Sequence, residues 1–287
     1  MFKKDSGLNI VSWNARIAQY AKHGHALEAL NCFKQMQSEG FVPNNVTFAF
    51  TLQACTIIGA IAQGEEIHRV IKIKEFLEGD IFLGNALLGM YVKCCLLPKA
   101  CMVFEELSAR DVVTWTMLIS GYTKHGYVDE AFTCYDRMQI ESVSPDVITF
   151  LCCLKVCAIT GTLDKGQQIH SQITQNGFLE SDLRIGNALV DMYAKCSELV
   201  KAIAVFDELK IRDTVSWNAL IMGYVIHGYS ERAINCYEQM QYEAIPPDSV
   251  TFLCALKACI IIDSISEGQK MHIEIVKYGL ESELLGW

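Results

Sequence analysis

The sequence predicts an all-α protein, a right-handed superhelical α-solenoid of helix-turn-helix repeats. Two observations predict it. Trp13, Trp115 and Trp217 recur at an offset of 102 residues, and each long period divides into shorter segments whose apolar residues have helical spacing. A lone helical hairpin cannot bury both of its faces, so neighbouring hairpins must stack. No run of 18 apolar residues occurs, so we expect no membrane span.

Six columns of identical residues share the 102-residue offset. The columns are Trp13, Trp115, Trp217; Gly24, Gly126, Gly228; Cys32, Cys134, Cys236; Pro43, Pro145, Pro247; Cys55, Cys157, Cys259; and His68, His170, His272. Tyr91 and Tyr193 belong to a segment that occurs twice. We interpret the Trp and Cys columns as a shared core. No Cys-x-x-Cys pair occurs among the 13 cysteines, so we expect buried small hydrophobes in a reducing compartment.

The long period divides into segments of 35, 36 and 31 residues. Eight repeats result, at residues 10–44, 45–80, 81–111, 112–146, 147–182, 183–213, 214–248 and 249–284. Residues 1–9 are interpreted as the remnant of a leader and residues 285–287 as a tail. Solenoids need polar caps at their ends, and none is visible in the sequence, so we expect the chain to be a fragment.

Each repeat is predicted to form two helices. In the first repeat, apolar residues from Val11 to Tyr20 have near-helical spacing, and Gly24 breaks the run. Apolar residues from Leu27 to Met36 then mark a second helix, and Pro43 closes the repeat.

The net charge of −9 and pI of about 5.3 disfavour a protein that grips duplex DNA over a wide face, but they permit a locally basic groove. His272 and Glu274 have the His-x-Glu form of a zinc deaminase. However, His272 belongs to a repeat column, and no Cys-x-x-Cys pair follows it. We therefore expect no enzyme, no catalytic or metal site, no cofactor and no small-molecule substrate.

The repeats resemble a known family. A 35-residue unit with Trp-Asn near its start, Ala-Leu midway and Pro-Asn or Pro-Asp at its end is similar to a pentatricopeptide repeat. The alternation of 35, 36 and 31 residues resembles the plant-type PLS subclass, whose members act in organellar RNA editing and processing. GNALLGMYVKC and GNALVDMYAKC are similar to its short repeats, and GEEIH, GQQIH and GQKMH to its long repeats. The resemblance covers nearly the whole chain.

The resemblance implies that each repeat meets one nucleotide of single-stranded RNA through its fifth and last residues. A terminal Asp only accepts hydrogen bonds and so favours the imino N–H of uracil or guanine, whereas Asn can donate to cytosine or adenine. A fifth-position Asn leaves space for a pyrimidine, and Thr leaves space for a purine. The base-reading pairs are Asn14/Asn44 for C, Asn85/Asp111 for U, Thr116/Asp146 for G, and Asn187/Asp213 and Asn218/Asp248 for U. The long repeats carry Ala49, Leu151 and Leu253 at the fifth position, so the expected target is C-n-U-G-n-U-U-n.

Two further columns follow from the resemblance. Apolar second residues, which would wedge between bases or pack between repeats, are Val11, Phe82, Val113, Leu183 and Val215. Lysines at the end of the first helix, which would contact phosphates or cap that helix end in solvent, are Lys22, Lys93, Lys124 and Lys195. Ile226 interrupts this column in the last 35-residue repeat.

The sequence thus predicts a specificity factor for C-to-U RNA editing or RNA processing in a mitochondrion or chloroplast, with any editing enzyme supplied in trans. No transit peptide is visible. Two alternatives remain open at this point. One is a scaffold that binds proteins or peptides, and the other is a truncated copy without function.

Overall fold

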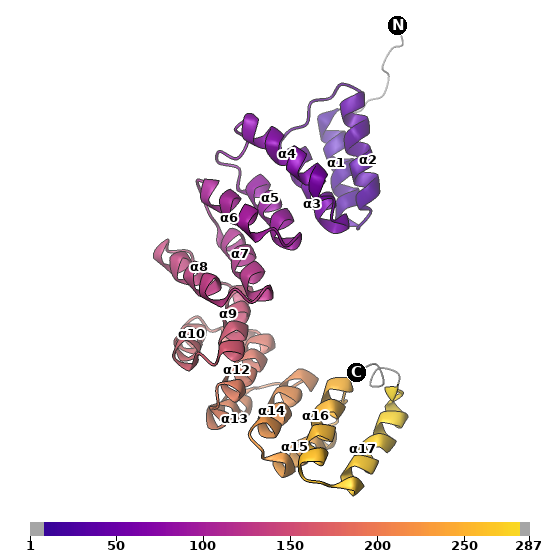
Figure 1. The fold of residues 1–287 in the computed structure, drawn as a ribbon, viewed down its shortest axis with the longest axis vertical. Coiled ribbons are helices and arrows are strands. Elements are labelled where there is room, and N and C mark those ends of the chain that lie inside the picture. Colours follow the sequence, from indigo (N-terminus) through magenta and orange to yellow (C-terminus); the bar gives the residue numbers. More distant parts are fainter. Residues whose placement is uncertain (1–8, 282–287) are drawn as a thin grey trace. The chain divides into compact units, whose positions relative to one another are not determined.

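The structure is a computed structural model that describes residues 9–281. Within this range the chain forms seventeen α-helices and no strand, which confirms the all-α solenoid of helical hairpins (Figure 1). The helices belong to two compact units, which meet in sequence between Pro145 and Asp146. The expected leader remnant lies outside the described residues except for Asn9, as do the expected tail and the last residues of the eighth repeat.

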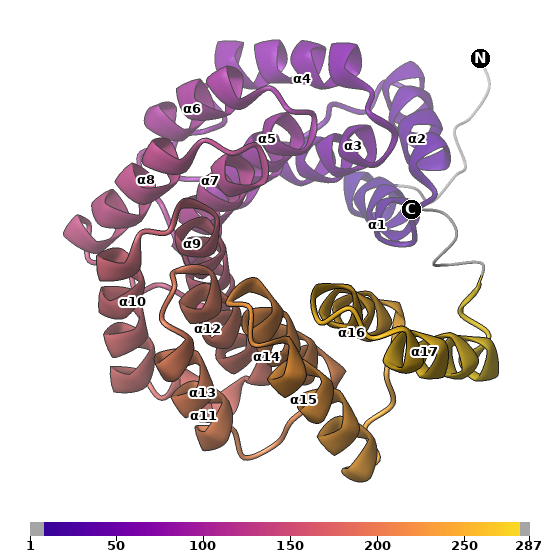
Figure 2. The same ribbon diagram turned by 60° about the horizontal axis from the view of Figure 1, so that its bottom comes forward.

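The first unit contains four helical hairpins. Their helices are α1 (Ile10–Lys22), α2 (Ala26–Ser38), α3 (Asn45–Ile58), α4 (Ile61–Ile73), α5 (Ile81–Lys93), α6 (Leu97–Glu106), α7 (Val112–Lys124) and α8 (Val128–Ile140). Figure 2 shows that α3, α5 and α7, the first helices of their hairpins, form one layer, and that α4, α6 and α8 form a second layer. First helices therefore pack on the first helices of neighbouring repeats as well as on the second helix of their own hairpin.

The second unit repeats this plan with one addition. Its helices are α9 (Val147–Thr160), α10 (Leu163–Gln175), α11 (Phe178–Ser181), α12 (Leu183–Lys195), α13 (Leu199–Glu208), α14 (Thr214–Ile226), α15 (Ser230–Tyr242), α16 (Ser249–Ile261) and α17 (Ile265–Tyr278). The short helix α11 was not expected. The prediction of two helices per repeat is therefore wrong for residues 147–182, whereas the repeat 45–80, of the same length, has two.

The start of each first helix is fixed by an Asn or Asp directly before it. Each of these N-cap side chains accepts a hydrogen bond from a backbone N–H of the first turn, which would otherwise have no partner in the helix. At the hairpin turn of the first repeat, Gly24 has a φ of +80°, a conformation that glycine adopts without strain. Cys95 and Ser197 occupy the corresponding turns of the short repeats, with φ of 60° and 64°.

The Trp column lies in the core, as predicted. Trp13, Trp115 and Trp217 are at most 1% exposed. In each unit an aromatic ring meets the tryptophan edge-on, with ring centroids 4.6 Å apart for Phe104 and Trp115 and 4.8 Å apart for Phe206 and Trp217. Most cysteines are buried or half-buried free thiols, but the prediction is wrong for Cys95, which is exposed in its turn.

Two contacts tie each long repeat to the short repeat that follows it. A Cβ built on Gly64 would lie 2.8 Å from Cε of Met90, and one built on Gly166 would lie 2.6 Å from Sδ of Met192. His68 Nδ1 also lies 2.8 Å from the Tyr91 hydroxyl. The same pair recurs in the second unit, where His170 Nδ1 lies 2.9 Å from the Tyr193 hydroxyl. Glycine thus provides the space, and histidine the hydrogen bond, for the next helix.

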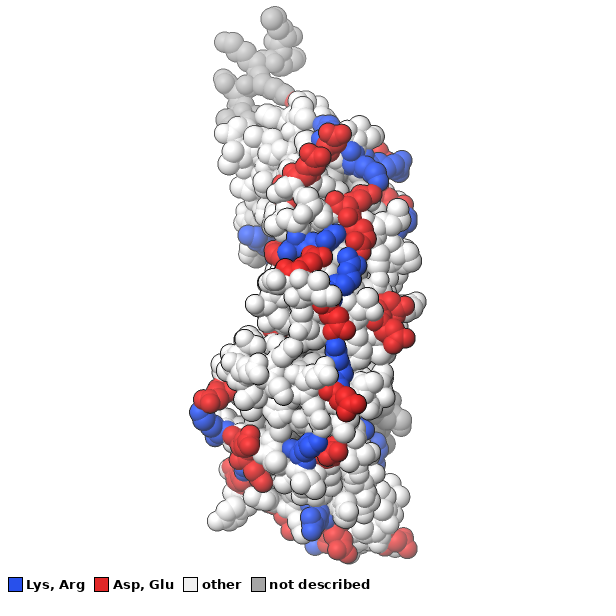
Figure 3. All heavy atoms as spheres, turned by 90° about the vertical axis from the view of Figure 1, so that its left-hand side faces the viewer, with Lys and Arg blue, Asp and Glu red and all other residues white. Residues whose placement is uncertain are grey.

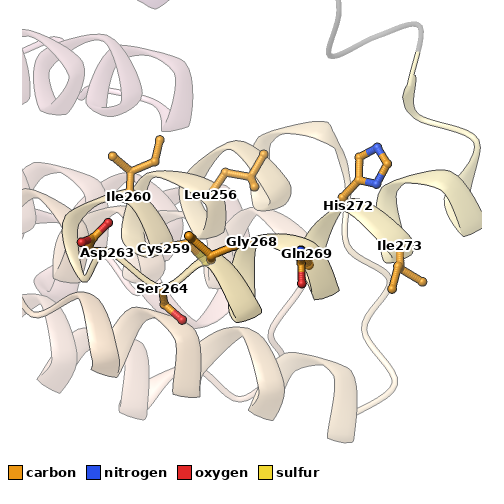
Figure 4. A pocket seen from close by; sticks show the side chains of 10 residues that line it. Leu256, Cys259, Ile260, Asp263, Ser264, Gly268, Gln269, His272 and Ile273 are labelled. Carbon is orange, nitrogen blue, oxygen red and sulfur yellow. The ribbon is translucent and has the colours of Figure 1, made fainter.

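The third member of each of these columns lies on α17. Among the residues that the structure describes, no atom beyond the neighbouring backbone of its own helix lies within 4 Å of a Cβ built on Gly268. Figure 4 shows Gly268 and His272 beside Leu256, Cys259 and Ile260 of α16, around a hollow of about 660 Å³. Among residues 9–281, no helix combines the length and apolar character needed to cross a bilayer.

Candidate nucleic-acid interface

Four of the five predicted base-reading pairs are joined by a hydrogen bond. In each, the side-chain amide of the fifth residue donates to Oδ1 of the last residue of the same repeat. The donor–acceptor distances are 3.0 Å for Asn14 and Asn44, 3.2 Å for Asn85 and Asp111, 3.1 Å for Asn187 and Asp213, and 2.9 Å for Asn218 and Asp248. The four fifth-position asparagines are 7–9% exposed, whereas the last residues are half-buried.

Helix capping determines which atom of the last residue faces outward. Oδ1 of Asp248 accepts the backbone N–H of Thr251 at 2.9 Å, and Oδ1 of Asn44 accepts that of Thr47 at 3.0 Å. The inner atom is therefore an oxygen whether the residue is Asp or Asn. The other terminal atom differs, since it is a carboxylate oxygen in Asp248 and an NH₂ group in Asn44. An exchange of Asp for Asn thus keeps the cap and changes an acceptor into a donor.

The same contacts keep two of these carboxylates ionised. Burial acts to raise the pKa of Asp111, but hydrogen bonds from Thr114 and Asn85 outweigh it, so the pKa lies below its usual value. The pKa of Asp213 is lowered in the same way, against the effect of burial, by hydrogen bonds from Ser216 and Asn187. Both side chains are therefore acceptors at neutral pH.

The remaining predicted positions differ from these four pairs. Thr116 belongs to the first unit and Asp146 to the second, whereas both members of each of the four hydrogen-bonded pairs lie within one unit. In the long repeats the fifth residue is aliphatic and the last residue has other partners. Asp80 accepts from the Asn45 side chain at 2.7 Å, and Asp182 accepts from the Arg184 guanidinium at 2.6 Å.

The apolar second residues lie mostly at the surface. Val11, Phe82, Val113 and Val215 are 44–69% exposed. Side chains this exposed bury little surface between repeats, which disfavours the role of packing between repeats for these four residues. The prediction is wrong for the repeat 183–213, since Leu183 is its first residue and is half-buried, whereas the second residue is the exposed Arg184. The long repeats continue the column with Val46, Ile148 and Val250, which are also exposed and which the sequence analysis missed. Their signal was the apolar residue two places after each terminal Asn or Asp.

The four predicted lysines each end a first helix and are exposed. Lys93 and Lys124 border a hollow of about 890 Å³ on α3, α5 and α7, whose lining also includes Asn85, Asp111 and Phe82. The structure therefore brings one reading pair, one exposed aromatic ring and two ammonium groups to the same groove.

The other two lysines have neighbours of their own. The Lys22 ammonium lies 5.6 Å from the centroid of the Phe50 ring, and Lys195 forms an ion pair with Asp191. Lys195 borders a smaller hollow of about 310 Å³ between α9 and α12. Lys155 borders the same hollow and was not predicted, because it lies in the middle of α9 and not at the end of a first helix.

Outside these grooves, charges of both signs are mixed. Figure 3 shows a face on which Lys and Arg alternate with Asp and Glu. Ion pairs between the second helices account for part of this pattern, for example Lys72 with Glu106 and Arg137 with Glu105. No group of three or more His, Cys, Asp or Glu residues in the described part of the chain could hold a metal ion.

Comparison with known families identifies the repeats. The model of the PPR repeat family matches residues 8–56, 110–159 and 212–260, which is more than half of the chain, and a model of the PPR repeat matches residues 85–112 and 187–213. The chain belongs to the PPR repeat family. The matched segments contain the fifth residue of every predicted reading pair, and these residues lie on α1, α5, α7, α12 and α14.

Curated relatives extend well beyond this chain. An Arabidopsis thaliana pentatricopeptide repeat-containing protein is 36% identical over 259 residues, which cover 90% of this chain and 35% of the relative. Two others from the same plant, named as chloroplastic and mitochondrial, are 32% and 36% identical and cover 92% and 88% of this chain. The chain spans 32–42% of the length of the eight relatives compared.

Solved structures of a PPR protein share the fold. The pentatricopeptide repeat protein PPR10, crystallised with an 18-nt psaJ RNA element, superposes with a TM-score of 0.83 at 25% identity. The match covers 96% of this chain and 41% of PPR10. PPR10 from maize without a named RNA matches with a TM-score of 0.81.

Proposed function

We propose that this PPR chain binds single-stranded RNA with one nucleotide per repeat and prefers the sequence C-n-U-G-n-U-U-n. The observation that carries the proposal is the hydrogen-bonded pair at the fifth and last positions. Each described pair holds an amide against an oxygen that is fixed by a helix cap, and so leaves one donor or acceptor edge in a constant place. These pairs occur in the 35- and 31-residue repeats, and aliphatic residues replace the fifth residue in the 36-residue repeats. Peptide binding does not explain this alternation.

The groove of the first unit suits a nucleotide chain. A pairing edge at Asn85 and Asp111, the exposed ring of Phe82, and the ammonium groups of Lys93 and Lys124 correspond to the hydrogen-bonding, stacking and phosphate contacts of single-strand binders. The likeness to PPR10, which was crystallised with an RNA element, supports the same ligand class.

We further propose that the full protein acts in a chloroplast or mitochondrion as a specificity factor for C-to-U editing or RNA processing, and that any editing enzyme acts in trans. The support is the cycle of 35-, 36- and 31-residue repeats together with relatives named as chloroplastic and mitochondrial.

The test exchanges the outward atom of one pair. Asp248→Asn retains the cap but turns an acceptor into a donor, so the preferred base at the seventh nucleotide moves from U to C. A bidentate base contact discriminates by about 1–3 kcal/mol, and we expect the low end for this half-buried pair, which is a several-fold change. The measurement is a competition titration with two RNAs that differ only at that nucleotide.

Asp182→Asn is the matched control. It makes the same chemical change at the end of a long repeat, where Leu151 is the fifth residue and Asp182 is engaged by Arg184. The U/C ratio at the nucleotide of that repeat should stay constant. If Asp248→Asn leaves its ratio unchanged, or if Asp182→Asn shifts its own equally, base-by-base reading is wrong and a protein-binding scaffold becomes the better explanation.

A further inference from the structure

We infer that the third residue of each repeat is a positioning residue for the base-reading pair of the repeat before it. This residue carries a hydroxyl wherever the preceding pair is of the reading type. The inference rests on the proposed function and adds a third residue to each of the four hydrogen-bonded reading pairs, namely Thr47, Thr114, Ser216 or Thr251.

In the four hydrogen-bonded pairs the hydroxyl lies between the two members of the pair. Thr251 Oγ1 is 2.6 Å from Oδ1 of Asn218 and 2.9 Å from Oδ1 of Asp248. Thr47, Thr114 and Ser216 make the same short contact with the fifth-position asparagine, at 2.6, 2.7 and 2.6 Å. All of these hydroxyl-bearing residues are 0% exposed, so water does not replace the contact.

The hydroxyl sets the orientation of the asparagine side chain. A hydroxyl has one proton, and the shorter contact assigns it to Oδ1 of Asn218. Its lone pairs remain free for the backbone N–H of Asp248, which lies 3.0 Å away. With Oδ1 held in this way, Nδ2 of Asn218 must face Asp248, and the remaining N–H of that amide keeps a constant direction. The geometry is a triad rather than a pair.

The distribution of the hydroxyl along the chain supports a role in reading. It follows every repeat that has Asn or Thr at the fifth position, in 35-residue and 31-residue repeats alike. After the first two long repeats, whose fifth residues are Ala49 and Leu151, the third residue is instead Leu83 or Ile185, each fully buried. Helix capping alone does not explain this difference, because Asp80 caps α5 through the backbone N–H of Leu83 without any hydroxyl.

The experiment replaces Thr251 and measures the U/C ratio at the seventh nucleotide. Thr251→Val has nearly the same shape but cannot donate, so Oδ1 of Asn218 loses its partner and the amide is free to turn. We expect the several-fold preference for U to fall to near unity. Thr251→Ser should restore it, since Ser216 fills the same role in the preceding pair. A ratio of affinities does not depend on the fraction of folded protein, so partial unfolding of the valine variant does not imitate the effect.

Thr51→Val is the matched control, because Thr51 is also fully buried but its hydroxyl donates to the Thr47 backbone carbonyl of its own helix. It should leave the U/C ratio unchanged. If the wild-type chain shows no U/C preference at the seventh nucleotide, the proposed function itself fails. If the wild type discriminates and Thr251→Val discriminates equally well, base reading stands and the positioning role of the hydroxyl is overturned.

Discussion

Lys195 forms an ion pair with Asp191, with 2.8 Å between Nζ and Oδ2, at the end of the same helix. A phosphate must compete with this carboxylate for Lys195, whereas Lys93 and Lys124 face the groove without a described ion pair. The logarithm of the affinity for single-stranded RNA should fall linearly with the logarithm of the salt concentration. We expect Lys93→Gln and Lys124→Gln each to make this slope shallower by roughly 0.7, and Lys195→Gln to change it by less. Replacing all four column lysines should flatten the slope by about 3 or less.

The measurement is a salt titration of RNA affinity, with Lys34→Gln as the control because Lys34 lies on the second helix α2. If Lys34→Gln and Lys124→Gln give the same slope, the column lysines do not contact phosphates and are solvated residues at helix ends.

The glycines of α10 and α17 should respond oppositely to alanine. A Cβ at Gly166 overlaps with the fully buried Met192, and overpacking of this kind costs about 1–3 kcal/mol. Gly268 has open space, so Gly268→Ala should gain the helix propensity of alanine, up to about 1 kcal/mol. Urea unfolding followed by circular dichroism should show a lower midpoint for Gly166→Ala and a raised one for Gly268→Ala. Equal midpoints would contradict the proposed fit between Gly166 and Met192.

The histidine–tyrosine pairs should make stability sensitive to mild acid. Burial lowers the pKa of His68 and of His170 below 6.5, so both are neutral in the folded chain. Since the unfolded chain takes up these protons first, the stabilisation is complete above pH 6.5 and is lost as the pH falls below it. The buried Nε2 of His68 has no hydrogen-bond partner among the described residues, so a proton there is especially unfavourable.

The variant His68→Gln/His170→Gln removes both titrating groups. Its thermal midpoint should fall less than that of the wild type between pH 7 and pH 5, while the comparison at pH 7.5 gives the cost of the substitution itself. Parallel curves over the whole range would exclude these histidines as the cause of acid sensitivity. Carboxylates such as Asp111 lose their contribution only at lower pH, because their pKa is lowered from 3.8.

The hairpins and the reading pairs could be predicted because their signals are local and repeat along the chain. Helical spacing, a glycine at the turn and a terminal Asn or Asp specify each hairpin within 35 or so residues. The resemblance to pentatricopeptide repeats then named the fifth and last residues, and four of the described pairs lie within hydrogen-bond distance.

The features that were missed depend on three-dimensional context. Thr47 and Thr251 were not singled out from the sequence, and only the distance to the preceding asparagine shows that one hydroxyl serves two repeats. The short helix α11 forms in the repeat 147–182 but has no counterpart in the repeat 45–80 of equal length, so the repeat period does not predict it. Cys95 is exposed in a hairpin turn, where its backbone is left-handed with a φ of 60°. The repeat columns do not show that this cysteine lies in a turn.

The residue that ends each reading repeat is at once a proposed recognition letter and the cap of the next helix. Asp and Asn rank alike as caps, whereas Ala costs about 1 kcal/mol at such a position. Under the proposed function, Asp248→Asn therefore changes the preferred base and leaves the free energy of unfolding nearly unchanged. Base specificity in such an array can therefore change during evolution through substitutions that are neutral for folding. The last position of a reading repeat is limited to residues that can cap the N-terminus of a helix.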